Sequence, residues 1–281
     1  MSGQTERRAS PPSPGRWQAE ALWQQLTPLW PGFSIEVVAT LPSTNTALLE
    51  RLRTPAALGH AERRTRDDGP MLLVAERQTA GRGRMGRTWQ STPDGSLTFS
   101  LALALQRPDL AGLSLAVGLA LAQALDPQGQ HLGLKWPNDL CLRTDGRKLG
   151  GVLIEAVQQG AQRHVVIGVG LNVLPLPSSS SLPASAALAE WWPDATPPLA
   201  LARLLPPLAQ ALHAFDAQGF APLVGAYAER DVLSGHPITT TDAACPAGMA
   251  LGVDADGALK MRAAGGQIHR IVSGEVSVRA A

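Results

Sequence analysis

Three arginines alternate with three glycines between Gln78 and Gln90, where the chain reads QTAGRGRMGRTWQ. Glycine has no Cβ, so its backbone can take positive φ and lie close against a ligand. Arginine carries a permanent charge and a fork of donors that matches a phosphate or a carboxylate. Apolar runs on both sides, Met71–Ala75 and Ser96–Leu103, predict strands. We therefore interpret the stretch as a loop between two strands that closes on an anion.

Several other kinds of loop are also rich in glycine or arginine. No Gly-Lys-Ser/Thr follows the glycines, which excludes a P-loop. A strand rather than a helix is predicted to follow, which argues against a dinucleotide fingerprint. An arginine–glycine segment that binds nucleic acid is an alternative, although a single short copy between strands argues against it. A plain solvated hairpin is the other alternative.

The composition is that of an ordinary globular protein, with 281 residues, 44% of them hydrophobic and 17% charged, and a formal net charge of +1. This length allows one to two domains with a full core. The near-zero charge makes the arginine loop a local feature and weighs against general polyanion binding. Two distant cysteines, Cys141 and Cys245, match no metal spacing and indicate a reducing compartment. Without a membrane span or a signal peptide, we expect a cytoplasmic protein with no membrane partner.

Small polar residues at Ser43, Thr44 and Asn45 follow a predicted strand, Ile35–Ala39, and precede a predicted helix, Thr46–Arg53. Side chains of this kind at a strand-to-helix turn can hydrogen-bond a small polar ring in a ligand. Capping of the helix by Ser43 or Thr44 explains the same residues, so both interpretations stay open.

A second polar set surrounds the segment Trp136–Asp139, which reads WPND. The strand that begins at Leu132 runs into it, and the proline favours an extended conformation before it. Lys148 follows an Asp-Gly hairpin turn and precedes Gly150–Gly151, which indicates close approach to that backbone. Asn-Asp is also ordinary turn chemistry, and a solvated lysine is common, so these remain alternatives.

The rest of the chain is interpreted from its hydrophobic pattern. Met1–Gly15 reads as a disordered tail, and Leu174–Pro183 as a flexible loop. The strand over His164–Val173 has two internal glycines and Asn172, which indicates that a ligand or another backbone needs the room. Further helices are predicted over Arg16–Leu26, Leu110–Leu125, Ala186–Trp192, Leu199–Gln218 and Phe220–Arg230. A small β-barrel is predicted from strands at Pro237–Thr241, Met249–Val253, Ala258–Met261, Ile268–Val272 and Glu275–Arg279.

Five motifs resemble those of the biotin–protein ligases in order and spacing. They are Ser43–Asn45, Gly81–Trp89, Lys135–Asp139, Lys148–Gly151 and Gly168–Asn172. The segment Gly274–Arg279 also resembles the last strand of that family, so the resemblance runs from about Ile35 to the end of the chain.

The resemblance implies an α/β fold of the class II aminoacyl-tRNA-synthetase/biotin-ligase type. A mixed sheet is expected, with helices on one face, followed by a small SH3-like β-barrel. The implied domains are a tail and short helix over 1–33, a biotin- and ATP-binding catalytic domain over 34–232, and the SH3-like domain over 233–281. About 34 residues precede the first catalytic strand. Bifunctional members need more for their helix-turn-helix, so we expect no DNA binding and no repressor activity.

The resemblance also implies a two-step ligation. The carboxylate of biotin attacks the α-phosphate of Mg-ATP, which yields biotinyl-5′-AMP and pyrophosphate. A lysine on a biotin carboxyl carrier protein then attacks the mixed anhydride and releases AMP. Because two anions must meet, such a site needs fixed cations and backbone donors, and the adenylate must be shielded from water. The implied small molecules are biotin, ATP and Mg²⁺, and the protein itself is expected as a monomer or weak homodimer.

Site residues follow from the resemblance, motif by motif. The catalytic set is Lys148, Arg84 and Asp139, of which Asp139 also orients or deprotonates the incoming lysine and is the one candidate protein ligand for Mg²⁺. The biotin-binding set is Ser43, Thr44, Asn45, Gln78, Arg82, Gly83, Arg84 and Lys148. The nucleotide-binding set is Arg84, Arg87, Asn138, Asp139, Asn172 and Arg279. Trp89 and Trp136 are walls of the site or plain core.

The sequence departs from the family pattern at two places, and it leaves two alternative functions open. Met85 stands where many members have arginine or lysine. The aromatic residue that stacks on adenine in some members is not placed, because Trp191 and Trp192 do not align convincingly. A lipoate-type ligase shares the fold and the adenylate chemistry. A non-enzymatic nucleic-acid-binding protein explains the arginines but neither WPND nor Lys148.

Overall fold

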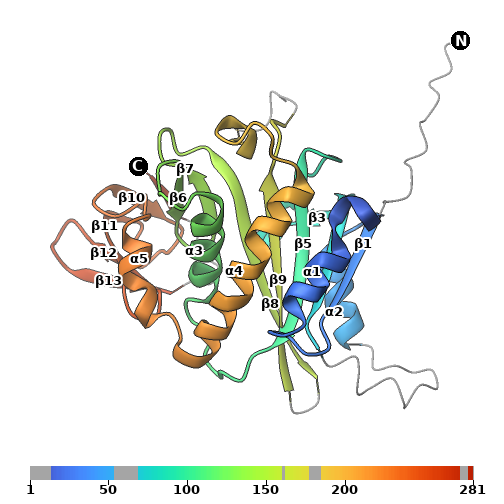
Figure 1. The fold of residues 1–281 in the computed structure, drawn as a ribbon. Helices are drawn as coiled ribbons and strands as arrows, with labels where there is room; N and C mark the ends of the chain where they lie inside the picture. The colour runs from blue at the N-terminus through green and yellow to red at the C-terminus, as the bar shows by residue number, and fades with distance from the viewer. Residues whose placement is uncertain (1–13, 54–68, 160–161, 177–184, 273–277, 281) are drawn as a thin grey trace, which may run out of the picture.

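The structure, a computed structural model, describes residues 14–53, 69–159, 162–176, 185–272 and 278–280. A seven-stranded sheet lies at its centre, in the order β1-β2-β5-β9-β8-β7-β6 (Figure 1). β1 and β2 are parallel, and the other neighbours are antiparallel, so the sheet is mixed, as predicted. The strands are β1 (Ser34–Leu41), β2 (Met71–Gln78), β5 (Ser96–Ala104), β6 (Leu132–Lys135), β7 (Asp139–Leu142), β8 (Lys148–Gln159) and β9 (Gln162–Asn172).

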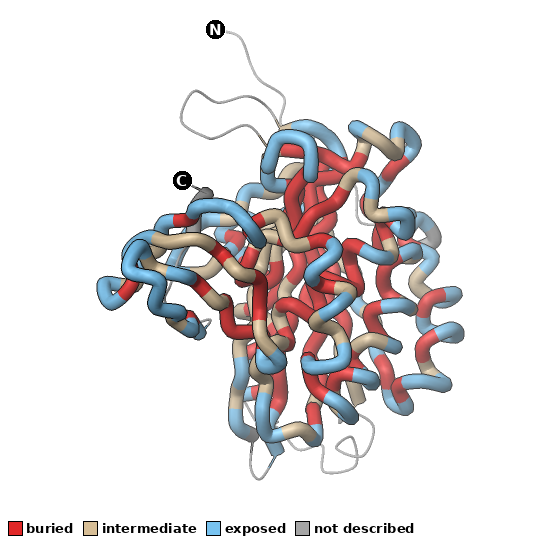
Figure 2. Tube along the Cα trace, turned by 90° about the vertical axis from the view of Figure 1, so that its left-hand side faces the viewer, coloured by how far each residue is buried: buried red, intermediate tan, exposed pale blue. Residues whose placement is uncertain are grey.

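Three helices cover one face of this sheet: α1 (Ala19–Leu26), α3 (Leu113–Leu125) and α4 (Pro197–Gln218) (Figure 1). The strands alternate in the side chains that they turn to this layer. In β9, for example, Val165 and Ile167 belong to the large core that includes these helices. Buried residues line both the strands and the inner sides of the helices (Figure 2). This is the helical layer that the sequence predicted.

The opposite face carries a smaller second core under helix α2 (Thr44–Arg53). Leu48 and Leu49 of α2 pack there against Leu73 and Val166, which are the alternate residues of β2 and β9. The sequence pattern predicted this helix but not its side of the sheet. Its N-terminus matters most, because it brings Thr44 and Asn45 over the middle of strands β5 and β9.

The helix predicted over Ala186–Trp192 is wrong. Only a 3-10 turn forms there, at Leu188–Glu190. The Ala186 N–H donates to the Lys148 carbonyl at 2.9 Å and the Ala187 N–H to the Glu190 carboxylate at 2.9 Å. Ala186 is therefore bonded to strand β8, and Ala187 is extended (φ −138°, ψ 151°) and caps the 3-10 turn. The tertiary bond of Ala186 outweighs local helix propensity here.

Other element boundaries differ in smaller ways. The helix predicted from Leu110 begins at Leu113, after Gly112 with φ 78°. The helix predicted over Phe220–Arg230 is a 3-10 turn, Ala221–Leu223, followed by the short α5 (Val224–Ala228). The predicted tail and the predicted Leu174–Pro183 loop lie largely outside the described residues, whereas Pro14–Trp17 form a 3-10 turn.

The C-terminal part forms a separate antiparallel sheet of five strands, in the order β13-β12-β11-β10-β14. It docks on the main body through the turn at Gly257, which has φ 81°. The buried Trp136 indole N–H donates to the Gly257 carbonyl at 3.0 Å, and a Cβ on Gly257 would lie 2.9 Å from Gly112 Cα. The small sheet thus supports the WPND segment from behind. Its strands are β10 (Pro237–Thr240), β11 (Ala247–Val253), β12 (Leu259–Arg262), β13 (Ile268–Ile271) and β14 (Val278–Ala280).

A buried ion pair joins the end of α3 to the segment after α5. Asp126 accepts backbone hydrogen bonds from His131 and Leu132, both at 2.8 Å, and Arg230 lies 3.6 Å from its carboxylate. Arg230 also donates to the Asp126 carbonyl at 2.7 Å. Burial raises the pKa of the Asp126 carboxyl, but the backbone donors and Arg230 lower it by more, so it lies below its ordinary value.

We predict that Asp126→Asn lowers the free energy of unfolding by about 3 kcal/mol at pH 7, because it leaves the buried Arg230 without its counter-ion. A lowered carboxyl pKa stabilises the fold above the unfolded pKa of about 3.9, and that stability is lost as the pH falls. The deficit of the variant therefore shrinks below about pH 4. Urea unfolding from pH 7 to pH 3 measures it. The exposed Asp109→Asn serves as control, and a deficit that is independent of pH contradicts the assignment.

Candidate active site

A cavity of about 850 Å³ opens on the face of the sheet that also carries α2. Small and polar residues alternate along three adjacent strands beneath it. Strand β9 contributes Gly168, Gly170 and Asn172. Their partners in the neighbouring strand β5 are Ser100, Thr98 and Ser96, in that order. A Cβ on Gly168 would lie 2.2 Å from Asn45 Oδ1, and one on Gly170 would lie 2.5 Å from the Trp89 ring. These glycines therefore let Asn45 and Trp89 lie directly on the sheet.

One end of the cavity is a network of neutral hydrogen-bonding groups. Gln78 Oε1 accepts from the Thr44 N–H at 2.7 Å and lies 3.1 Å from Thr44 Oγ1. The buried Ser100 hydroxyl lies 2.6 Å from Thr44 Oγ1 and 2.5 Å from Asn45 Oδ1. Ser43 Oγ accepts from the Thr46 N–H at 3.4 Å, which is the capping bond that the sequence allowed. Such an end suits an uncharged polar ring.

The glycine–arginine segment folds over the cavity as a hairpin between β3 (Gly81–Arg82) and β4 (Thr88–Trp89). The Gly83 N–H donates to the Arg87 carbonyl at 2.7 Å. At the tip, Met85 has φ 56° and Gly86 has φ 71°. This closed turn needs a glycine next to Met85 and aims the arginines on either side in different directions.

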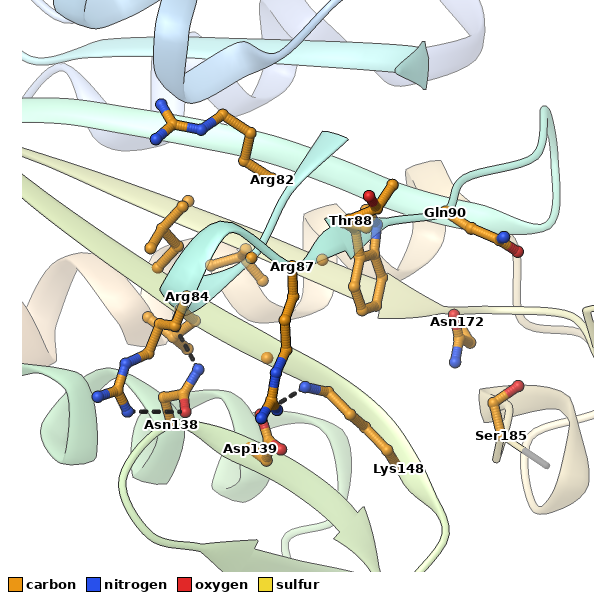
Figure 3. Close-up of a pocket in the computed structure, with 18 of the residues that line it drawn as sticks. Arg82, Arg84, Arg87, Thr88, Gln90, Asn138, Asp139, Lys148, Asn172 and Ser185 are labelled. Atoms are coloured by element: carbon orange, nitrogen blue, oxygen red, sulfur yellow. Dashed lines mark hydrogen bonds and ion pairs between the residues drawn. The ribbon is translucent and has the colours of Figure 1, made fainter. Parts of the chain in front are cut away.

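The other end of the cavity gathers charge. Lys148 Nζ donates to Asp139 Oδ1 at 2.6 Å, and Arg84 Nη1 donates to Asn138 Oδ1 at 3.2 Å. Arg87 points toward the same group (Figure 3). Burial lowers the pKa of Arg84, and the nearby Asp139 charge partly offsets the effect. Three cations beside a single carboxylate can receive an anionic ligand.

Strand geometry explains how these residues meet. Asp139 opens β7 and pairs with Gly151 of β8, three residues beyond Lys148. A Cβ on Gly151 would lie 3.1 Å from Asp139 Oδ1 and 3.3 Å from Lys148 Nζ. The absence of a side chain at Gly151 therefore leaves the space in which the Lys148–Asp139 ion pair lies. The sequence indicated such a close approach to this backbone.

A third set borders the cavity beside Asn172. The Asn172 side-chain amide donates to the Ala186 carbonyl at 3.1 Å. Its Oδ1 atom, like Trp89 Nε1, is buried without a hydrogen-bond partner among the described residues. Buried polar atoms of this kind call for a donor or acceptor from elsewhere. Both side chains line the cavity, but these two atoms are themselves buried against the protein.

The segment that carries Ala186 is held in place by Arg147. Its guanidinium donates to the Glu190 carboxylate at 3.0 and 2.6 Å, to Asp145 at 2.7 Å and to the Ser185 carbonyl at 3.2 Å. These bonds to Arg147 hold the pKa of Glu190 below its ordinary value. The hairpin turn before Lys148 and the segment beside Asn172 are thereby tied together.

The structure brings the predicted site residues together around one cavity, with the exception of Arg279. Arg82 also lines the cavity, but its side chain is turned away from Arg84 and Lys148 (Figure 3), and its guanidinium lies 3.6 Å from Glu155. Arg279 lies in β14 opposite Thr239, and its side chain is outside the described part of the chain. The cavity is lined by Ser43, Thr44, Asn45, Gln78, Gly83, Arg84, Arg87, Trp89, Trp136, Asn138, Asp139, Lys148 and Asn172, among others.

Sequence reasoning missed three residues of this region: Ser100, Glu155 and Arg147. Ser100 and Glu155 are polar residues within apolar strands, on the face that also carries the glycines of β9. That alternation was the available signal. Arg147 had none, because its partner Glu190 is 43 residues away in the chain.

Comparison with known proteins decides the family. A model of the biotin/lipoate A/B protein ligase family matches residues 38–172, and a model of the biotin protein ligase C terminal domain matches residues 235–279. The bifunctional ligase/repressor BirA of Escherichia coli K12 is 32% identical over 257 residues, which cover 89% of this chain and 75% of that protein. The chain belongs to the biotin–protein ligase family.

For two further relatives, the match to this chain spans most of the relative's own length. The biotin–[acetyl-CoA-carboxylase] ligase of Paracoccus denitrificans is 33% identical over 220 residues, which are 71% of this chain and 87% of that one. The biotin protein ligase of Aquifex aeolicus, solved in complex with biotin and ATP, aligns with a TM-score of 0.73 and 26% identity over 88% of this chain and 99% of that one. In the described part of our ligase, no helix has the length and apolar character of a bilayer span.

We predict that Arg147→Gln speeds amide hydrogen exchange at Ala186 and Ala187, because the Glu190 and Ser185 contacts that hold their segment are lost. Exchange at Leu171, in the centre of the sheet, stays unchanged. Exchange measured by mass spectrometry on peptides covering 185–192 tests this. Arg51→Gln, which removes an exposed ion pair with Glu36, is the matched control. Equal exchange in Arg147→Gln and wild type contradicts a tether at Arg147.

Proposed function

We propose that this chain ligates biotin to a lysine of a carrier protein through biotinyl-5′-AMP. The observation that carries the proposal is the polarity of the cavity. Neutral hydrogen-bonding groups around Thr44 and Gln78 form one end, and the cations Arg84, Arg87 and Lys148 gather at the other. Biotin has the matching shape, with an uncharged ureido ring at one end and a carboxylate at the other. The aligned Aquifex aeolicus protein, solved with biotin and ATP, supports the same reading.

In the first step, a biotin carboxylate oxygen bonds to the α-phosphorus of ATP, and the bond to the β-phosphate breaks to release pyrophosphate. We assign Lys148 to the meeting point of the two anions, because its ammonium lies at the charged end on an edge of the cavity. Asp139, at 2.6 Å, holds it there. Arg84 and Arg87 stabilise the charge that builds on the phosphate. Positioning and electrostatics then account for most of the catalysis.

In the second step, the amine of the carrier lysine attacks the carbonyl of the mixed anhydride, the acyl–phosphate bond breaks, and AMP leaves. The amine must lose a proton to complete the amide. Asp139 is the candidate acceptor, since its carboxylate lies 2.6 Å from Lys148 at the charged end of the cavity. The carrier is proposed as the biotin carboxyl carrier domain of a biotin-dependent carboxylase, by analogy with the ligase of Paracoccus denitrificans. Only ligase activity is proposed.

We assign the neutral end to the biotin ring and the region of Asn172 to adenine or ribose. Ser43, Thr44 and Gln78 contact the ring, whereas Asn45 holds them in position, because its amide is already bonded to protein groups. Asn172 and Trp89 both line the cavity. We propose Arg82, which lines the cavity, for the biotin carboxylate, and Arg279 for the triphosphate. We propose residues 34–232 as the catalytic domain and residues 233–281 as the C-terminal domain.

Magnesium fits this site as a partner of the phosphates. Among the described residues no cluster of three potential metal-ligating side chains occurs. Magnesium is commonly held by one or two carboxylates together with substrate phosphates and water. Asp139 is the protein ligand that we propose, and the bound ion would neutralise phosphate charge.

Pyrophosphate release by the purified protein, with biotin or lipoate and without acceptor, tests the proposal. We expect about one equivalent, with biotin only, because the site retains its adenylate until an acceptor arrives. Removal of Mg²⁺ by EDTA should abolish release. Release with lipoate keeps the fold and mechanism but contradicts the biotin assignment. Release with neither acid contradicts the enzyme function.

We predict that Lys148→Ala lowers the rate of pyrophosphate release by about 10³-fold, which is the scale of losing one electrostatic group in a water-excluded site. The fold should be retained, because Lys148 is about half exposed. Thermal unfolding and single-turnover kinetics measure the two effects. Lys260→Ala, in the C-terminal sheet, is the control lysine. A near-normal rate for Lys148→Ala sinks its catalytic assignment.

A further inference from the structure

Glu155 lies behind the neutral end of the cavity rather than in its lining. It is on β8 opposite Val166, two residues beyond Leu153 on the same face. Its carboxylate has two neighbours. Oε2 accepts from the Asn45 side-chain amide at 3.0 Å, and Oε1 lies 3.6 Å from the Arg82 guanidinium. The proposed reaction leaves this carboxylate without a role.

The Glu155 carboxylate decides which way the Asn45 amide points. An ionised carboxylate only accepts hydrogen bonds, whereas an amide side chain has a donor end and an acceptor end. Asn45 must therefore turn its Nδ2 toward Glu155, where it also reaches the Leu153 carbonyl at 3.4 Å. Its Oδ1 is then directed at the Ser100 hydroxyl, 2.5 Å away. The Leu153 carbonyl is also acceptor-only and favours the same orientation, but at 3.4 Å it is the weaker of the two contacts.

The orientation passes on through two hydroxyl groups, each of which has one proton. Ser100, which is fully buried, commits its proton to Asn45 Oδ1. Thr44 Oγ1 then has two protein acceptors within reach, Ser100 Oγ at 2.6 Å and Gln78 Oε1 at 3.1 Å. With either acceptor the Thr44 proton is used inside the protein. Thr44 Oγ1 therefore presents lone pairs to the cavity, and it accepts from a ligand N–H.

We infer that Glu155 is a positioning residue that sets the hydrogen-bond polarity of the biotin-ring end of the cavity. Through Asn45 and Ser100 it makes Thr44 an acceptor for an N–H of a cyclic urea. The inference rests on the proposed function, since the urea ring is that of biotin. Gly168 belongs to the same device, because its missing side chain leaves the room that the Asn45 amide occupies.

The second neighbour of Glu155 links this end of the cavity to the arginine hairpin. Arg82 stands at the start of that hairpin, and about half of its side chain is exposed. An exposed ion pair contributes little on its own. The relay through Asn45 is therefore the main effect of Glu155, and the Arg82 contact is secondary.

Glu155→Gln tests the inference, because it keeps the size of the side chain but lets it offer a donor to Asn45. We expect the Kd for biotin, measured by calorimetry without ATP, to rise about tenfold, the scale of a hydrogen bond to a charged group. The KM for ATP and the melting temperature should stay close to wild type. Glu155→Asp, which restores the acceptor-only group, should recover part of the affinity. Glu36→Gln, at an exposed carboxylate with an ion pair to Arg51, should bind biotin as wild type does.

Glu155→Gln in an Arg82→Gln background separates the two contacts of Glu155, because the ion pair is already absent there and the relay should still weaken biotin binding about tenfold. No further loss of affinity in that background would overturn the relay in favour of the ion pair. Wild-type affinity in Glu155→Gln would overturn the inference while leaving the proposed function intact, and so would a parallel rise in the KM values for biotin and ATP. A wild-type protein that binds no biotin contradicts the proposed function and the inference together.

Discussion

The rest of the structure depends on one constraint: the face of the central sheet that carries α2 must leave space for the side chains of the site. Strands β8 and β9 place Gly151, Gly168 and Gly170 on the face opposite the main helical layer. A Cβ would collide with Asn45 at Gly168 and with Trp89 at Gly170, and at Gly151 it would crowd the Lys148–Asp139 pair. With larger residues there, neither the ion pair of Lys148 nor the ring of Trp89 could lie against the sheet. The glycines weaken strand propensity, which the long antiparallel pairing of β8 with β9 offsets.

The open face needs support from both sides. Behind it, the apolar alternate residues of the same strands form the large core with α1, α3 and α4. At one edge, the C-terminal sheet contacts the site region through the hydrogen bond from Trp136 to Gly257. The buried Asp126–Arg230 pair ties the end of α3 to the segment after α5 that leads into this sheet. The rigid layers carry the stability, while the polar face is left to carry the chemistry.

Within the cavity, neutral and charged hydrogen bonds are separated in space. The Thr44–Ser100–Asn45 network is nearly saturated by protein groups and therefore has a defined polarity. The cations near Asp139 are more exposed and can exchange partners. A ligand with an uncharged ring and an acidic tail is thus oriented by the whole cavity. The Glu155 carboxylate, which lies behind the cavity lining, joins this network through its hydrogen bond from Asn45.

The sequence by itself determined much of this protein. Periodicity predicted the central strands and the long α4, because a buried strand or helix leaves its period in the chain. The glycine–arginine segment, WPND and Lys148 identified the family and most of the residues around the cavity, because residue type and spacing survive in local motifs.

Only the tertiary structure decided which of these residues touch. It turned Arg82 toward Glu155, paired Arg147 with Glu190, and bonded Ala186 to β8 where a helix was predicted. It also placed α2 across from the other helices. The physical reason is the same in each case: the partners are far apart in the chain, so the hydrogen bonds and contacts that select these arrangements leave no periodic or local signal in the sequence.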